Sequence, residues 1–375
     1  MSANTEAIQE FDCFGSRCAA LVTGTGEAGS AHNAASLARH TLLSWHERFS
    51  RFLATSELSL LNGDPRREVP VRALMARFVD AVRTAGNMTG GLVDATLLGE
   101  IESAGYADHL HTSLPLQAAL ALAPTRTPAS GSQHRHWRQI EVNLDTCTIT
   151  RPPGLRLDSG GLAKGLFADV LGETLATHPG FSINCAGDLL IGGAAGITRP
   201  IRVESPFDGR IVHTFNLSRT GVATSGIGRR SWLDHNARPA HHLLNPATGR
   251  PAFTGVVQAT ALAPSALLAE IRAKAALLSG PHAAPTWLAH GGVLVFDDGS
   301  HQVLQPPALV TLSQLSSFLQ RPRTHALQWR HRTNPNPDAA TAHARTPTPS
   351  SLAVTAKSAL SCPVSSSAGS GREMK

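Results

Sequence analysis

The chain has 375 residues, 42% of them hydrophobic, which is enough to bury a sizeable core in one large domain or two lobes. Its formal net charge of +6 lies in residues 318–375, where eight Lys and Arg side chains accompany two acidic ones, whereas residues 1–317 are neutral overall. A basic surface for nucleic acid is therefore not predicted for the main part of the chain.

The five cysteines have neither Cys-x-x-Cys spacing nor the spacing of metal ligands, which is typical of a reduced intracellular protein. Residues 1–17 contain no basic segment followed by an apolar run, and no stretch approaches the ~18 apolar residues of a membrane helix. We therefore expect a cytoplasmic protein without a membrane span.

The first third of the chain predicts a strand and two helices. Residues 11–23 alternate enough to form a strand, with an interruption at Gly15 and Ser16. Apolar side chains then recur every three or four positions over residues 38–49 and 74–85, as on one face of an amphipathic helix. Residues 103–137 are rich in Ala, Pro, Ser and His without clear periodicity, and we expect a surface excursion there.

The densest signal is DSGGLAKG at residues 158–165, where a strand pattern gives way to helical spacing. Glycines at a helix N-terminus let a ligand's oxygens approach the outward-pointing N–H groups, and Lys164 adds a positive charge beside them. This combination suits a phosphate or pyrophosphate, although a tight turn with a solvated lysine has the same pattern. The spacing matches neither the P-loop nor the Rossmann fingerprint.

The second half of the chain adds two polar pairs. Thr224 and Ser225 stand between glycines, where hydroxyls can donate to phosphate oxygens or belong to an ordinary turn. Ser265 is placed to cap a helix that carries Glu270 and Lys274 four positions apart, a spacing that by itself favours a surface ion pair. Beyond about residue 321 the chain is rich in Pro, Ser, Thr and Ala, which predicts a disordered tail.

Taken together, several segments resemble the ApbE family, the FAD:protein FMN transferases or flavin transferases. The similarity runs in unbroken order over residues 14–296. Its segments are FGS at 14–16, FSRF at 49–52 with SEL at 56–58, TGGLVDAT at 89–96, DSGGLAKG at 158–165, ATSG at 223–226 and HLLNPATG at 242–249. No single segment is decisive, but six in the family's order are a specific match.

The resemblance implies an α+β, T-fold-like architecture of antiparallel sheets with packed helices, and a FAD cleft between two lobes. It assigns residues 1–320 to one flavin transferase domain and leaves 321–375 as the basic tail. In this family a Thr or Ser hydroxyl of an acceptor flavoprotein attacks the pyrophosphate of FAD, takes the FMN group and releases AMP. FAD is therefore the expected substrate, and Mg²⁺ together with a lysine is expected to neutralise the pyrophosphate.

The same resemblance assigns site residues by their place in the motifs. Ala163 is expected to offer its backbone carbonyl to the metal, and Glu270 to act as metal ligand or base. The residues expected to bind FAD are Phe14, Phe52, Leu92, Val93, Asp94, Lys164, Thr224, Ser225, His242 and Leu244.

One position departs from the family pattern. Where the family has Asp and Thr as metal ligands four residues apart, this chain has Glu270 and Lys274. An ammonium group has only donors, so Lys274 cannot ligate a cation. Either the metal is bound differently, or the Lys274 ammonium stands in the place of Mg²⁺ and takes part in catalysis. The competing functions are a hydrolase that cuts FAD to FMN and AMP, and a flavin-binding protein that has lost transfer.

Overall fold

The computed structural model describes residues 5–108, 110 and 113–306, which belong to one compact unit. The predicted tail at 321–375 lies outside the described residues, as do the last residues of the predicted domain. Within the described part, the expected α+β fold of antiparallel sheets with packed helices is confirmed.

The largest element is an eight-stranded antiparallel sheet with strand order β1-β2-β8-β9-β12-β17-β18-β19. Its strands are β1 (Glu6–Cys13), β2 (Ser16–Thr23), β8 (Gly180–Cys185), β9 (Asp188–Gly192), β12 (Thr220–Gly226), β17 (Val256–Ala263), β18 (Gly292–Phe296) and β19 (His301–Leu304). The neighbours β2 and β8 come from segments far apart in the chain, so the sheet joins the N-terminal hairpin to the second half of the sequence.

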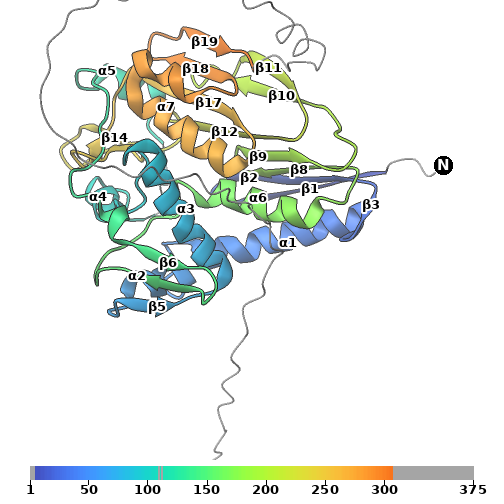
Figure 1. Cartoon of the computed structure of the whole chain (residues 1–375). Coiled ribbons are helices and arrows are strands. Elements are labelled where there is room, and N and C mark those ends of the chain that lie inside the picture. Colours follow the sequence, from blue (N-terminus) through green and yellow to red (C-terminus); the bar gives the residue numbers. More distant parts are fainter. Residues whose placement is uncertain (1–4, 109, 111–112, 307–375) are drawn as a thin grey trace, which may run out of the picture. The chain divides into compact units, whose positions relative to one another are not determined.

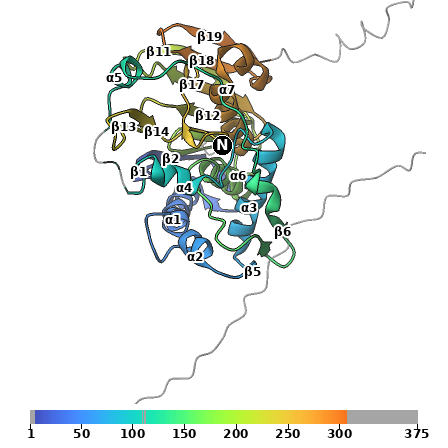
Figure 2. The same ribbon diagram turned by 90° about the vertical axis from the view of Figure 1, so that its left-hand side faces the viewer.

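Three helices, α1 (Ala31–Phe49), α6 (Ala163–Leu175) and α7 (Ala266–Trp287), pack along one face of this sheet (Figure 1). Helix α1 contacts β1 and β2, α6 contacts β8 and β9, and α7 contacts β12 and β17. In the view turned by a quarter, α6 and α7 lie to the right of β12, and the ribbon β13–β14 lies to its left (Figure 2). The face away from these three helices carries loops, small sheets and the short helix α5 (Leu116–Ala121), which contacts β13 and β14.

The other elements flank this core. The remaining helices are α2 (Glu57–Gly63), α3 (Ala73–Thr89), α4 (Leu98–Ser103), α5 (Leu116–Ala121) and the 3₁₀ turn η1 (His136–Gln139). The small sheets pair β3 (Thr25–Gly26) with β4 (Gly29–Ser30), β5 (Glu68–Pro70) and β6 (Glu141–Asn143) with β7 (Thr148–Thr150), β10 (Arg199–Glu204) with β11 (Ile211–Leu217), β13 (Ser231–Leu233) with β14 (Pro239–His241), and β15 (Leu244–Asn245) with β16 (Arg250–Pro251). None of the helices in the described part of the chain combines the length and hydrophobicity that crossing a membrane requires.

The predicted helices form where the sequence places their caps. Ser265 accepts a hydrogen bond from the Leu268 N–H at 3.2 Å and begins α7, as expected. The predicted helices over 38–49 and 74–85 lie within α1 and α3, and Gly90 ends α3 in the left-handed conformation.

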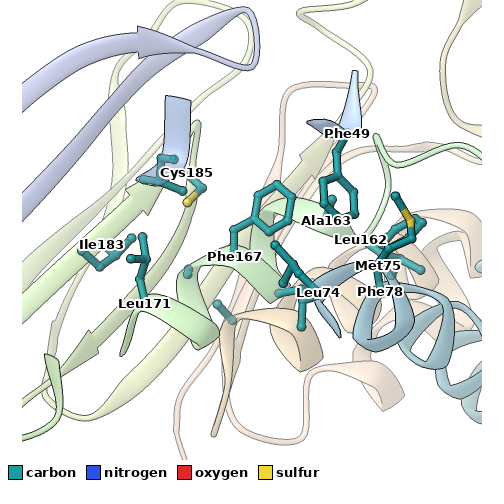
Figure 3. Close-up of a cluster of buried hydrophobic side chains, with 14 of the residues drawn as sticks. Phe49, Leu74, Met75, Phe78, Leu162, Ala163, Phe167, Leu171, Ile183 and Cys185 are labelled. Atoms are coloured by element: carbon teal, nitrogen blue, oxygen red, sulfur yellow. The ribbon is translucent and has the colours of Figure 1, made fainter. Parts of the chain in front are cut away.

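Phe167 of α6 lies at the centre of an aromatic cluster in the core. Its ring is fully buried, and it packs against Phe14, Trp45 and Phe49 at centroid distances of 5.8, 5.2 and 5.0 Å. Figure 3 shows Phe167 between the strand residues Ile183 and Cys185 on one side and Phe49 on the other. This packing holds α6 between the sheet and the end of α1, and so fixes the start of α6 where the glycine motif lies.

The strand expected over residues 11–23 is in fact a hairpin. β1 and β2 pair in antiparallel register and turn at Phe14 and Gly15, whose φ angles are 56° and 68°. Two left-handed residues in succession give a tight two-residue turn, which the sequence reading took for an interruption within one strand. The turn brings Phe14 to the rim of the sheet.

The segment 103–137 is only partly at the surface. Leu116 of α5 is buried, and the Trp137 ring is 1% exposed. That ring lies against Gly86 of α3, where an added Cβ would come within 2.4 Å of it. The expected surface excursion therefore also covers part of the core, because isolated apolar anchors can bury without any periodic pattern.

Candidate active site

A cavity of about 1660 Å³ is lined by residues of the large sheet and by residues of α6 and α7. Paired residues of a sheet point to the same face, and the pair Thr224 and Thr260 of β12 and β17 lines the cavity. Gly221, three positions from Thr224, points the other way, and a Cβ there would come within 2.2 Å of the Ser265 backbone at the start of α7. The sheet thus contributes residues such as Thr224 and Thr260 to the cavity from the face opposite Gly221, whereas Lys164 and Lys274 reach the cavity from α6 and α7.

The structure brings the predicted site residues together. Every one of them except Glu270 lines this cavity: Phe14, Phe52, Leu92, Val93, Asp94, Ala163, Lys164, Thr224, Ser225, His242, Leu244 and Lys274. They come from the β1–β2 turn, the loops after α1 and α3, the start of α6, β12, the β14–β15 segment and α7. Glu270 lies directly behind the lysines, with no exposed surface.

Two features hold helices α6 and α7 against each other at this site. The Asp169 carboxylate of α6 accepts hydrogen bonds from the N–H groups of Ala266 and Leu267, at 2.7 and 3.0 Å, and thereby caps α7 from outside. An added Cβ on Gly165 would come within 2.7 Å of the Ala266 carbonyl oxygen, so a glycine is needed there. This close approach sets the spacing between Lys164 and the side chains of α7.

Four charged side chains meet at the crossing of these helices. Lys164 Nζ and Lys274 Nζ each lie 3.1 Å from Glu270 Oε1. The Gly165 N–H donates to Glu270 Oε2 at 2.9 Å, and Lys164 also forms an ion pair with Asp188. Two ammonium groups are therefore balanced by two carboxylates, in a cluster whose side chains are all at most 15% exposed.

Burial and the neighbouring charges shift pKa values within this cluster in opposite directions. Burial alone raises the pKa of Glu270, but the positive charges of Lys164 and Lys274 outweigh it and lower the value to about 2. Burial raises the pKa of Asp188 to about 6 despite the charge of Lys164. Burial opposes the charged form of Lys164, but Asp188 and Glu270 together raise its pKa above the ordinary value. Glu270 is thus a fixed anion at neutral pH.

Uncharged hydrogen-bonding groups complete the cavity wall. The hydroxyls of Thr224 and Thr260 are 2.9 Å apart, and Ser225 follows on β12. Burial lowers the pKa of His242 well below its usual value, so its ring is neutral. The Nδ1 atom of His242 is buried without a hydrogen-bond partner in the structure. An unpaired polar atom at the wall of a cavity suits a hydrogen bond to a ligand.

Sequence reasoning missed a stack of aromatic and guanidinium groups at the cavity wall. The Arg51 guanidinium carbon lies 4.2 Å from the Phe52 ring centroid and 4.6 Å from that of Tyr106. Tyr106 packs in turn on Trp232, with centroids 5.3 Å apart. Only FSRF at 49–52 signalled this group, because Tyr106 and Trp232 come from segments without a motif.

Two carboxylates were also left unassigned. Asp158 opens the glycine motif, lines the cavity and lies 3.4 Å from Arg51 Nε. Burial raises the pKa of Asp158, with the Arg51 charge opposing the shift. Asp188 begins β9 directly after Gly187, so its position beside the turn was the only sequence signal.

The donor set of this site does not fit Mg²⁺. Glu270 Oε1 is shared by two ammonium groups, and Oε2 accepts the Gly165 N–H. A Mg²⁺ ion bound at about 2.1 Å from Oε1 would lie within about 5 Å of both positive charges. Across the described ranges, no group of three or more His, Cys, Asp or Glu side chains is arranged to hold a metal ion.

Comparison with known proteins is consistent with this geometry. The model of the ApbE family matches residues 14–296. The FAD:protein FMN transferase of Escherichia coli K12 is 25% identical over 241 residues, which are 60% of this chain and 65% of that protein. The enzyme of the same name from Klebsiella pneumoniae is 26% identical over 246 residues, 61% of this chain and 66% of that protein. The matches thus span slightly less than two thirds of the length of these relatives.

Solved structures share the fold. The ApbE protein of Thermotoga maritima superposes with a TM-score of 0.63 at 20% identity, over 80% of this chain and 97% of that one. The flavinyl transferase ApbE of Pseudomonas stutzeri gives 0.62 at 18% identity, over 83% and 98%. Because the family model covers most of the described residues and the fold agrees, this chain belongs to the ApbE family.

Proposed function

We propose that this protein is a FAD:protein FMN transferase. It transfers FMN from FAD to a Thr or Ser hydroxyl of an acceptor flavoprotein and releases AMP. The proposal is supported by membership of the ApbE family and by the activity for which its relatives from E. coli and K. pneumoniae are named. A cytoplasmic location stays a prediction from the sequence.

The observation that carries the proposal is the pair of ammonium groups at the cavity. Lys164 and Lys274 line the wall, while the carboxylate that fixes them, Glu270, lies behind them without exposed surface. Two cations held in place at a cavity wall suit a diphosphate, because they neutralise its charge without needing to reorganise. At about 1660 Å³ the cavity exceeds the usual volume of small-ligand sites, ~300–1,000 Å³, as an extended dinucleotide requires.

We assign the parts of FAD to the wall by their chemistry. The pyrophosphate lies at Lys164 and Lys274, with the hydroxyls of Thr224 and Ser225 as further donors. The apolar residues Phe14, Phe52, Leu92, Val93 and Leu244 contact the flavin and adenine rings, while Asp94 and His242 offer polar contacts.

In the proposed step, the acceptor hydroxyl oxygen attacks the phosphorus atom of the FMN half of FAD. A new P–O bond forms to the acceptor, the P–O bond to the bridging oxygen breaks, and AMP leaves with that oxygen. The two lysines neutralise charge that develops on the bridging oxygen. The hydroxyl proton passes to a carboxylate, so that atoms and charge balance.

We assign the role of base to Asp158 and not to Glu270. Both oxygens of Glu270 already accept hydrogen bonds, and a pKa of about 2 makes it a weak base. Asp158 lines the cavity, its side chain is 16% exposed, and burial raises its pKa. Glu270 then serves to position the two lysines.

The test is to mix the purified full chain with FAD and candidate acceptor proteins, each paired with a variant whose Thr or Ser target is changed to Ala. AMP together with in-gel flavin fluorescence on the unmodified acceptor supports transfer. AMP with free FMN in the absence of acceptor labelling indicates the hydrolase, and bound FAD without AMP indicates a non-catalytic flavin-binding protein.

A further inference from the structure

Helix α7 places a cation where the reacting diphosphate of the proposed function would lie. Lys274 stands one helical turn after Glu270, and its Nζ is 3.1 Å from Oε1 of that carboxylate. Lys274 lines the cavity whereas Glu270 does not, so the positive group faces the ligand space and the negative group lies behind it.

The glycine motif is shaped around this lysine. A Cβ added to Gly161 would approach Lys274 Cε to 3.3 Å, closer than most Cβ contacts. The absence of a side chain at Gly161 therefore leaves the stem of Lys274 room to cross from α7 to the glycine turn. The Lys274 stem thus passes beside the glycine turn, and its ammonium group is held by Glu270.

The charges of the cluster also balance one another without a metal ion. Glu270 and Asp188 balance Lys164 and Lys274, and all the polar atoms of the Glu270 side chain are engaged by donors. A divalent ion at Glu270 would have to displace an ammonium group or lie beside two of them in a site with little solvent.

We propose that the Lys274 ammonium is a built-in replacement for a divalent cation, so that this chain binds and activates FAD without a metal. The identity of the diphosphate as FAD rests on the proposed function above, whereas the exclusion of the metal rests on the cluster alone. Lys164 and Lys274 then neutralise the pyrophosphate together.

The direct test is metal binding by the full chain without FAD. After chelator treatment and desalting, Mn²⁺ is titrated and the free ion is measured by its electron paramagnetic resonance signal. We expect no stoichiometric Mn²⁺ site in the unmodified protein. We expect one in Lys274→Thr, which removes a cation and adds an oxygen ligand beside Glu270. Arg272→Thr, on the same helix but bonded to His290, is the matched control and should gain none.

The second readout is FAD affinity, measured by flavin fluorescence with chelator or with Mg²⁺. The unmodified protein should change less than about twofold between the two conditions, and Lys274→Thr should bind at least about tenfold more weakly in chelator and recover with Mg²⁺. One tightly bound Mn²⁺ per unmodified chain, or FAD binding that chelator abolishes, would overturn the inference. If the unmodified chain does not bind FAD under either condition, the proposed function fails, and the Mn²⁺ titration alone still decides the exclusion of the metal.

Discussion

Lys164 and Glu270 are 106 positions apart in the sequence, yet Lys164 Nζ lies 3.1 Å from Glu270 Oε1. The contact exists because Asp169 caps α7 from α6 and Gly165 lets the two helices touch. These helix contacts fix the spacing between α6 and α7, and we attribute the Lys164–Glu270 ion pair to that packing. Mutations in the charge cluster and mutations at the helix crossing should therefore have separate effects.

Replacing Lys164 by Met tests the charge cluster. The change leaves Asp188, whose side chain is 2% exposed, without its ion-pair partner, and we expect unfolding at pH 7 to become easier by about 3 kcal/mol. The deficit should shrink at pH 5, since Asp188 can then take up a proton. Urea unfolding at both pH values measures this. The control Arg77→Met removes a mostly exposed ion pair with Glu173 and should cost less than about 1 kcal/mol. Equal losses in the two variants would contradict the account.

That Lys164 and Glu270 lie close together could be predicted from the sequence, but the contacts that bring them together could not. Lys164 followed from a glycine-rich turn opening a helix. The role of Glu270 followed only from the resemblance to the ApbE family, because its spacing to Lys274 by itself favoured a surface ion pair. The role of Asp169 was hidden, because an acidic residue in the middle of a helix gives no local sign that it caps another helix.

The aromatic wall was the least predictable part of the site. Tyr106 and Trp232 reach Arg51 only through the tertiary fold, and neither lies in a segment with a periodic pattern. The fold class itself followed from the order of six motifs, whereas the hairpin at Phe14 and Gly15 needed two left-handed residues that alternation alone does not reveal.

The pH dependence of stability should report on Glu270. Its folded-state pKa of about 2 lies below the ordinary value of 4.5, so its ionisation stabilises the fold above pH ~4.5 and this contribution is lost as the pH falls toward 2. The shift corresponds to a contribution on the order of 3 kcal/mol at neutral pH. Unfolding free energies of the unmodified chain and Glu270→Gln should therefore differ at pH 7 and converge between pH 4.5 and 2. A difference that stays constant over this window would show that the carboxylate charge is not what stabilises the cluster.

The external cap on α7 can be tested at Asp169. Asp169→Asn keeps at most one strong acceptor for the Ala266 and Leu267 N–H groups, and we expect a loss of about 1–2 kcal/mol in stability. FAD affinity should fall as well, because the start of α7 positions the turn that carries Glu270. Chemical unfolding and flavin fluorescence measure the two effects. Glu173→Gln on the same helix, in an exposed ion pair, is the control and should leave affinity unchanged. Normal FAD affinity in Asp169→Asn would show that the cap does not position the site.

The stack at the cavity wall predicts that Arg51 is not replaceable by lysine. The guanidinium plane lies over Phe52 and Tyr106 and donates to the Tyr106 carbonyl at 2.5 Å, and its side chain is only 7% exposed. An ammonium group cannot reproduce this planar contact, so Arg51→Lys should weaken FAD binding about tenfold. Arg48→Lys is the matched control, since Arg48 pairs with Glu57 and does not line the cavity. Equal affinity in both variants would remove the stack from the binding site.

Asp158 carries the prediction that separates binding from chemistry. A base must be unprotonated, so burial, which raises the pKa of Asp158, should make the rate of AMP release fall as the pH decreases through that raised value. Asp158→Asn should lower the rate about 10²-fold or more and remove this acidic limb, while FAD affinity changes only a few-fold, because the amide keeps the shape of the carboxylate. Asp94→Asn, at another cavity-lining carboxylate whose Oδ1 accepts from Thr96, should retain the limb. If Asp158→Asn keeps the limb and Glu270→Gln loses it, the base is Glu270, and the two hydrogen-bonded oxygens of that side chain must be released during the reaction.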